Sequence, residues 1–168
     1  MFDRGSGPPV VVIPGVQGRW EWMRPALEAL SQRCRTVSYS LSGDFGSGQR
    51  MDTNQDFDSY IRQLDTILET TGIDRATICG VSYGGLIALR YAALRPDRVS
   101  GLAIVSAPAP GWEPSAKQAS WLARPWLSAP AFVATGPLRL WPEIRSALPE
   151  AGRRLRFALA HGIRVLSA

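Results

Sequence analysis

A serine held between glycines is the feature of this chain whose residue types and spacing best fit chemistry. Gly80-Val81-Ser82-Tyr83-Gly84 follows a strand-like run at 75–81 and precedes a segment at 83–95 with helical spacing. On a tight turn between a strand and a helix, a serine hydroxyl is pushed out above the sheet, where it can attack a substrate. The pattern predicts that Ser82 is a nucleophile. The alternative is a glycine-rich turn whose serine only caps the helix.

The residue after the serine has a predicted role of its own. Backbone N–H groups and the helix dipole at a helix N-terminus favour a developing negative charge. The N–H of Tyr83 is therefore predicted to be one donor of an oxyanion hole.

Serine attack also needs a general base, usually a histidine oriented by a carboxylate. His161 is the single histidine, and beyond residue 107 the chain carries no aspartate, only glutamates. We interpret His161 as an incidental residue of an amphipathic helix. The alternative is a shortened enzyme in which Glu113 or Glu143 orients His161 as the base.

Short apolar runs alternate with amphipathic segments over the first two thirds of the chain. This alternation predicts an α/β fold with a parallel sheet, right-handed crossovers and flanking helices. The predicted strands lie at 9–15, 35–41, 75–81 and 98–107, and the predicted helices at 20–33, 56–71 and 83–95.

The character of the chain changes near residue 110. Four of the six tryptophans and the whole net charge of +5 lie beyond it, since 111–168 carry seven arginines and one lysine against three glutamates. We predict an α/β core at 1–110 and a helical, Trp- and Arg-rich lid at 111–168. Its predicted helices are 115–124, 137–147 and 150–166, and for 129–136 a strand is the alternative to a helix.

The composition describes a soluble globular protein, with 45% hydrophobic and 20% charged residues in 168. Without an apolar run of about 20 residues or a secretory signal, we expect a cytoplasmic protein that does not bind membranes. Two distant cysteines and one histidine offer no zinc-site spacing, and neither a metal nor an organic cofactor is implied. No recognition motif accompanies the positive charge, so we expect a small-molecule partner and no nucleic acid.

Two stretches resemble the α/β-hydrolase fold family. They are VVIPGVQGRWEWMRPALEAL and GVSYGGLIALRYAALRPDRVSGLAIVSAPAP, and the resemblance extends over about residues 9–110. It implies Ser82 as the nucleophile and the N–H groups of Val16 and Tyr83 as the oxyanion hole. The family commonly has His-Gly in the first loop, where this chain has Pro14-Gly15 and so keeps the glycine that shapes it.

The resemblance also implies where the remaining catalytic groups belong. In the family, the acid and the histidine usually follow the lid, although an acid directly after the strand 98–107 also occurs, which favours Glu113. We interpret the chain as the N-terminal two thirds of a larger hydrolase, with acid and base outside it and negligible turnover by this chain alone.

The leading hypothesis is a serine hydrolase that cleaves an ester, amide or related bond through an acyl-enzyme on Ser82. The Trp-rich lid suggests an apolar substrate, and the serine weighs against the aspartate-dependent dehalogenases of the same fold. Two alternatives stay open: a non-catalytic ligand-binding protein that keeps the fold, and an oligomer in which a second chain completes the site. The substrate and the bond type are not specified by the sequence.

Overall fold

The computed structural model describes the chain in two compact units, 1–110 and 111–168. Several predictions fall outside the described residues: Val16, His161, the segment 129–136 except residue 135, and most of the two last predicted helices. The described residues are 1–15, 18–43, 57–108, 111–123, 135, 141, 145, 150–152, 154–156 and 159.

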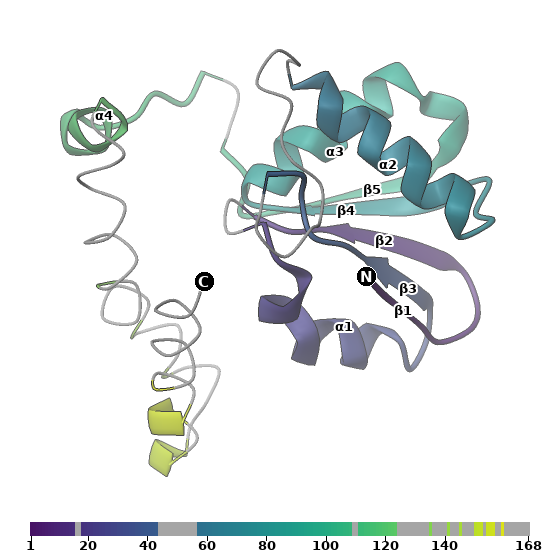
Figure 1. Cartoon of the computed structure of the whole chain (residues 1–168), viewed down its shortest axis with the longest axis horizontal. Helices are drawn as coiled ribbons and strands as arrows, with labels where there is room; N and C mark the ends of the chain where they lie inside the picture. The colour runs from purple at the N-terminus through teal and green to yellow at the C-terminus, as the bar shows by residue number, and fades with distance from the viewer. Residues whose placement is uncertain are drawn as a thin grey trace. The chain divides into compact units, whose positions relative to one another are not determined.

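A five-stranded sheet with the order β1-β3-β2-β4-β5 is the centre of the first unit (Figure 1). β2, β3, β4 and β5 are mutually parallel, as predicted, and β1 runs antiparallel to β3. The strands are β1 (Phe2–Arg4), β2 (Pro9–Ile13), β3 (Arg35–Ser38), β4 (Ala76–Val81) and β5 (Val99–Val105). The helices are α1 (Arg24–Leu30), preceded by a 3-10 turn at Trp20–Met23, α2 (Asp58–Thr70) and α3 (Tyr83–Leu94), followed by a 3-10 turn at Pro96–Arg98.

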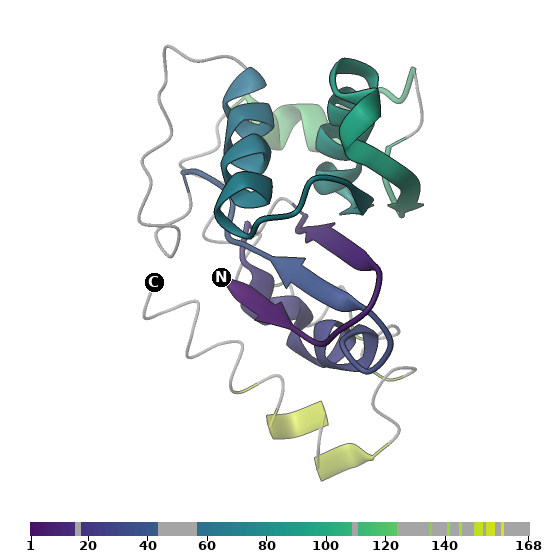
Figure 2. The same ribbon diagram turned by 90° about the vertical axis from the view of Figure 1, so that its right-hand side faces the viewer.

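Helices cover both faces of the sheet (Figure 2): α1 lies on one face, and α2 and α3 lie on the other. The alternation of side chains along β2 explains how both faces are buried. Val11 and Ile13 belong to the larger core with α2 and α3, whereas Val12 packs with Leu27 of α1. The predicted α/β fold is confirmed, with a mostly parallel sheet.

The short strand β1 was not predicted. It carries one apolar residue, Phe2, which is buried and packs on Trp20 with ring centroids 5.7 Å apart. Asp3 pairs with Arg35 of β3 at 2.8 Å. Three residues with one apolar side chain give no periodic signal, so the strand cannot be recognised from its own sequence. Its pairing with β3 depends on residues more than 30 positions away.

β3 is shorter than the predicted strand at 35–41. It ends at Ser38, but Tyr39, Ser40 and Leu41 stay buried. The apolar pattern therefore indicated burial correctly and the extent of strand pairing incorrectly.

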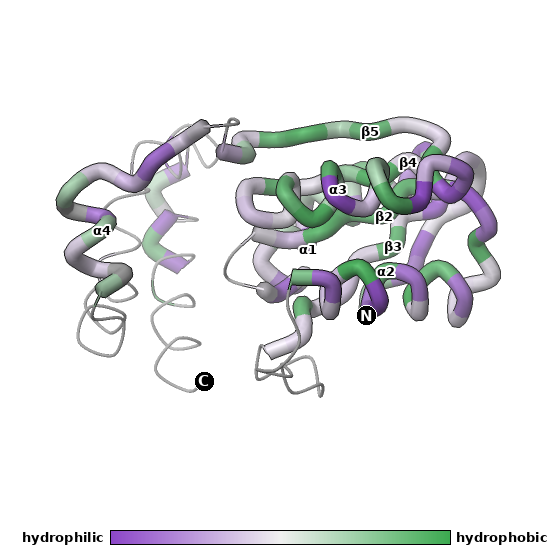
Figure 3. The backbone as a smooth tube through the Cα atoms, turned by 90° about the horizontal axis from the view of Figure 1, so that it is seen from above, coloured by the Kyte–Doolittle hydropathy of each residue, from purple (hydrophilic) through white to green (hydrophobic). Residues whose placement is uncertain are grey.

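β5 pairs with β4 and with no other strand in the part of the chain that the structure describes. Its apolar side chains are partly open to solvent: Leu102, Ile104 and Val105 are 40–46% exposed. Figure 3 shows this apolar strand along the edge of the sheet. An exposed apolar edge strand offers unpaired backbone groups to a further strand.

The second unit contains α4 (Ala116–Leu122), within the predicted helix 115–124. Its first turn is closed by a capping box, in which the Ser115 hydroxyl accepts from the Gln118 N–H and the Gln118 side chain accepts from the Ser115 N–H. Among the described residues, no helix is long and apolar enough to cross a bilayer.

The buried hydroxyl of Tyr39 makes stability sensitive to alkaline pH. Within the described residues this hydroxyl has no hydrogen-bond partner, and burial raises its pKa. The pKa of Tyr39 in the folded protein lies above the unfolded value of about 10. The free energy of unfolding is therefore unaffected by this group below pH of about 10 and falls as the pH rises above that value, because the unfolded chain loses the tyrosine proton first. We expect Tyr39→Phe to raise the free energy of unfolding by about 1 kcal/mol and to reduce its loss between pH 8 and pH 11, measured by urea denaturation.

Tyr91 supplies the matched control for that measurement. Its ring is equally buried, but its hydroxyl donates to Asp65 at 2.8 Å. Tyr91→Phe should therefore lower the free energy of unfolding at pH 8. Equal effects of the two substitutions would contradict the assignment of an unsatisfied hydroxyl to Tyr39.

Candidate active site

Ser82 lies on the turn between β4 and α3, where the sequence places it. Its backbone has φ 51° and ψ −119°, a conformation that an L-residue rarely adopts. Hydrogen bonds hold the turn: the Ser82 N–H donates to the Val105 carbonyl at 2.8 Å, and the Gly85 N–H donates to the Ser82 carbonyl at 2.9 Å. The Ser82 side chain makes no capping bond to α3, so the alternative of a capping serine is wrong.

The glycines on either side of Ser82 are required by close approach of the backbones. A Cβ on Gly80 would meet the Gly84 carbonyl oxygen and would lie 2.5 Å from the Gly85 Cα. A Cβ on Gly84 would lie 2.5 Å from the Pro14 carbonyl oxygen. The spacing predicted from the motif thus corresponds to direct contact of strand β4, helix α3 and the end of β2.

Ser82 and Gly15 lie at the carboxyl ends of β4 and β2, where the strand order of the sheet reverses along the chain. The chain passes from β2 to β3 on one side and then to β4 on the other, with α1 and α2 on opposite faces. The carboxyl ends of the strands beside such a point form the usual ligand-binding crevice of open α/β sheets. A Cβ on Gly15 would lie 3.3 Å from the Ser82 Cβ and 3.9 Å from its Oγ, so the loop after β2 lies against the serine.

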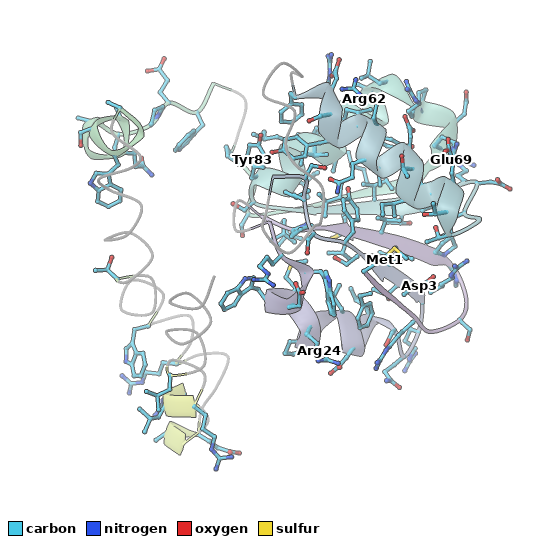
Figure 4. The ribbon with its side chains drawn as sticks, viewed as in Figure 1. Met1, Asp3, Arg24, Arg62, Glu69 and Tyr83 are labelled. Carbon is cyan, nitrogen blue, oxygen red and sulfur yellow. The ribbon has the colours of Figure 1, made fainter. Side chains whose placement is uncertain are left out.

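Tyr83, the predicted oxyanion donor, begins α3, and the N–H groups of a first helical turn have no intrahelical partner. Figure 4 shows Tyr83 at the end of the unit opposite Glu69. Its ring forms edge contacts with Phe57 and Tyr60, with centroids 6.0 and 5.9 Å apart. Burial first, and then the charge and hydrogen bond of Tyr60, raise the pKa of Tyr83. Phe57 and Tyr60, at the start of α2, thus pack against the residue that follows Ser82, which local spacing did not reveal.

The candidate acid and base are not brought to Ser82 by any described contact. Glu113 is exposed in the loop before α4, in the second unit. Glu143, His161 and the second predicted oxyanion donor, Val16, lie outside the described residues. The described part of the candidate site is therefore Ser82 and Tyr83, together with Gly15 and Gly18.

Comparison with known proteins identifies the family. The profile of the alpha/beta hydrolase fold matches residues 8–137, which is more than half of the chain. The chain belongs to the α/β-hydrolase fold family. Among curated relatives, the chain is 32% identical over 112 residues to the 2-hydroxy-6-oxo-2,4-heptadienoate hydrolase of Pseudomonas putida, covering 64% of the chain and 40% of that enzyme.

Two further relatives carry different names. RutD of Azorhizobium caulinodans, provisionally named a carbamate hydrolase, is 30% identical over 108 residues, which are 64% of this chain and 39% of that protein. Haloalkane dehalogenase 2 of Mycobacterium tuberculosis is 31% identical over 104 residues, which are 61% of this chain and 36% of that protein. The chain thus spans about 40% of the length of these relatives, which are hydrolases of several kinds.

Solved structures agree on the fold. The meta-cleavage product hydrolase CumD, as its A129V mutant, is 27% identical with a TM-score of 0.58, over 63% of this chain and 40% of that one. Cfl2 of Burkholderia cenocepacia is 26% identical with a TM-score of 0.61, over 87% of this chain and 51% of that one. The expected resemblance to α/β hydrolases is confirmed.

Proposed function

We propose that this α/β hydrolase is a serine hydrolase that cleaves an ester, amide or related bond through an acyl-enzyme on Ser82. The observation that carries the proposal is the conformation of Ser82. Its backbone is strained although its side chain makes no capping hydrogen bond to α3. Strain of this kind concentrates at functional sites. The names of its hydrolase relatives support the same general class.

The chemistry proposed for Ser82 begins with attack of its Oγ on a carbonyl carbon. The hydroxyl proton passes to a general base, the Oγ–carbon bond forms, and the leaving group departs with a proton. Water then cleaves the acyl-enzyme and restores the serine. The Tyr83 N–H, and the N–H of Val16 in the loop after β2, would hold the oxyanion of each tetrahedral intermediate.

The proposed substrate is a small apolar molecule that carries the scissile bond. The relatives named for 2-hydroxy-6-oxo-2,4-heptadienoate and for carbamate act, by name, on small carbonyl compounds. The Trp-rich segment 111–168 is proposed as the lid over such a substrate. For this chain we propose the bond class rather than one compound, because a shared fold does not select a reaction.

Covalent labelling with a fluorophosphonate tests the proposal. The serine oxygen displaces fluoride from phosphorus, so labelling needs a nucleophile but no knowledge of the substrate. In the protein expressed from its gene, we expect a single adduct on the peptide that contains Ser82, identified by mass spectrometry. Ser82→Ala should remove it.

Ser106 provides a matched control, since it is the other serine with a φ of 51° in the described chain. It follows β5 and is exposed. Ser106→Ala should leave labelling unchanged. An adduct on Ser106, or no adduct on any serine, would contradict the proposal and favour a ligand-binding protein.

A further inference from the structure

A buried glutamine on α2 holds the segment that follows β3. Gln63 is 9% exposed. Its Oε1 accepts the Ser42 N–H at 3.0 Å, and its Nε2 donates to the Ser40 carbonyl at 3.0 Å. A carboxamide offers the same donor and acceptor as a peptide group. Gln63 therefore replaces a neighbouring strand for residues 40–42, where β3 has ended.

The residue between these two anchors connects to the loop beside Ser82. The Leu41 N–H donates to the Gly18 carbonyl at 2.6 Å, and the Gly18 N–H donates to the Gly15 carbonyl at 2.8 Å. Gly15 in turn lies against Ser82, since a Cβ added to Gly15 would be 3.3 Å from the Ser82 Cβ. A continuous series of contacts thus runs from Gln63 to the proposed nucleophile.

We infer that Gln63 is a positioning residue for Gly18 and, through the bond between them, for Gly15 beside Ser82. Its bonds to Ser40 and Ser42 fix Leu41, the donor to Gly18. Without the carboxamide, the Ser40 carbonyl and the Ser42 N–H would lose these two bonds, and buried backbone groups tolerate the loss of a hydrogen bond poorly. The catalytic consequence rests on the proposed function, whereas the mechanical linkage does not.

Loss of the Gln63 hydrogen bonds should increase local opening at Leu41 and Gly18 more than it lowers the stability of the whole fold. Small displacements of groups around a reacting centre cost rate even when binding is kept. Gln63→Met keeps side-chain length and helix propensity but removes both polar atoms. The matched control is Tyr91→Phe. It removes a hydrogen bond to Asp65, which lies on α2 like Gln63, and leaves the bonds of Gln63 to residues 40 and 42 in place.

Two measurements on the protein expressed from its gene test the inference. The first is amide hydrogen exchange at Leu41 and Gly18, followed by NMR, which reports local opening. We expect exchange there to be about tenfold faster in Gln63→Met than in Tyr91→Phe, the equivalent of one lost buried hydrogen bond. The second is phosphonylation of Ser82, where the maximal rate constant should fall about tenfold with the probe's affinity unchanged.

Equal exchange at Leu41 in the two variants would overturn the inference. If Gln63→Met does not fold, Gln63→Glu replaces it, because the carboxylate keeps the acceptor for Ser42 but loses the donor to Ser40. Unchanged exchange in Gln63→Glu would also overturn the linkage. Faster exchange at Leu41 supports the linkage even if the unaltered protein shows no labelling, a result that would overturn the proposed function alone.

Discussion

In the protein expressed from its gene, Ser82→Ala is expected to lower kcat/KM for an activated aryl ester by about 10⁴-fold or more, as loss of a serine nucleophile does elsewhere. The substitution removes the one oxygen that forms the covalent bond. It leaves the backbone of the turn in place, because the Ser82 N–H and carbonyl make the bonds to Val105 and Gly85. The melting temperature should therefore change little, and paired rate and thermal-unfolding measurements check both parts.

Ser82→Gly separates chemistry from backbone strain. Glycine also lacks the hydroxyl, so turnover should fall as far as in Ser82→Ala. Glycine adopts φ 51° without a Cβ penalty, and relief of such strain contributes about 1 kcal/mol. The glycine variant should melt above both Ser82→Ala and the unaltered protein. Retained turnover in either variant would exclude Ser82 as the nucleophile.

Gly84→Ala is expected to produce a large loss of stability from a single added carbon. The new Cβ would meet the carbonyl oxygens of Ile13 and Pro14, which are backbone atoms that cannot rotate away. Either α3 or the end of β2 must move, at a cost of about 3 kcal/mol. Because both elements surround Ser82, turnover should fall by about 100-fold as well. Denaturant unfolding and the ester assay measure the two effects.

Gly152 provides the comparison for that substitution. It is helical and outside the first unit, and a Cβ there would meet no atom within 4 Å. Gly152→Ala should leave stability unchanged or slightly raised, since alanine favours helix over glycine by about 1 kcal/mol. A Gly84→Ala variant as stable as Gly152→Ala would show that the approach of β2 to α3 is not tight.

The turn that carries Ser82 was predictable because its determinants are local. Gly80, Ser82 and Gly84 lie within five positions, between a strand and a helix whose apolar periods are clear in the sequence. The parallel strands and their helices followed from the same alternation. The boundaries shifted by up to four residues at the start of α1, where a 3-10 turn takes the first positions, and by three at the end of β3, where the Gln63 side chain rather than a strand completes the hydrogen bonding.

The sequence does not distinguish the catalytic acid and base in the same way. Glu113 was one of several glutamates beyond the sheet, and nothing near it in the chain marks it as catalytic. Its exposed position before α4 adds no contact that would distinguish it. A catalytic acid is defined by its distance from a histidine, and residue spacing does not encode that distance when the two are far apart in the chain.

By itself the sequence determined that this is an α/β protein with a serine on a strand–helix turn, because backbone sterics and apolar periodicity act over a few residues. Only the tertiary structure decided what surrounds that serine. Gly15 contacts Ser82, and Phe57 and Tyr60 contact Tyr83, from positions roughly 20 to 70 residues away, while Gln63 connects to Gly15 through Leu41 and Gly18. Their meeting depends on the strand order β3-β2-β4, which is settled by packing of the whole sheet and leaves no local pattern in the chain.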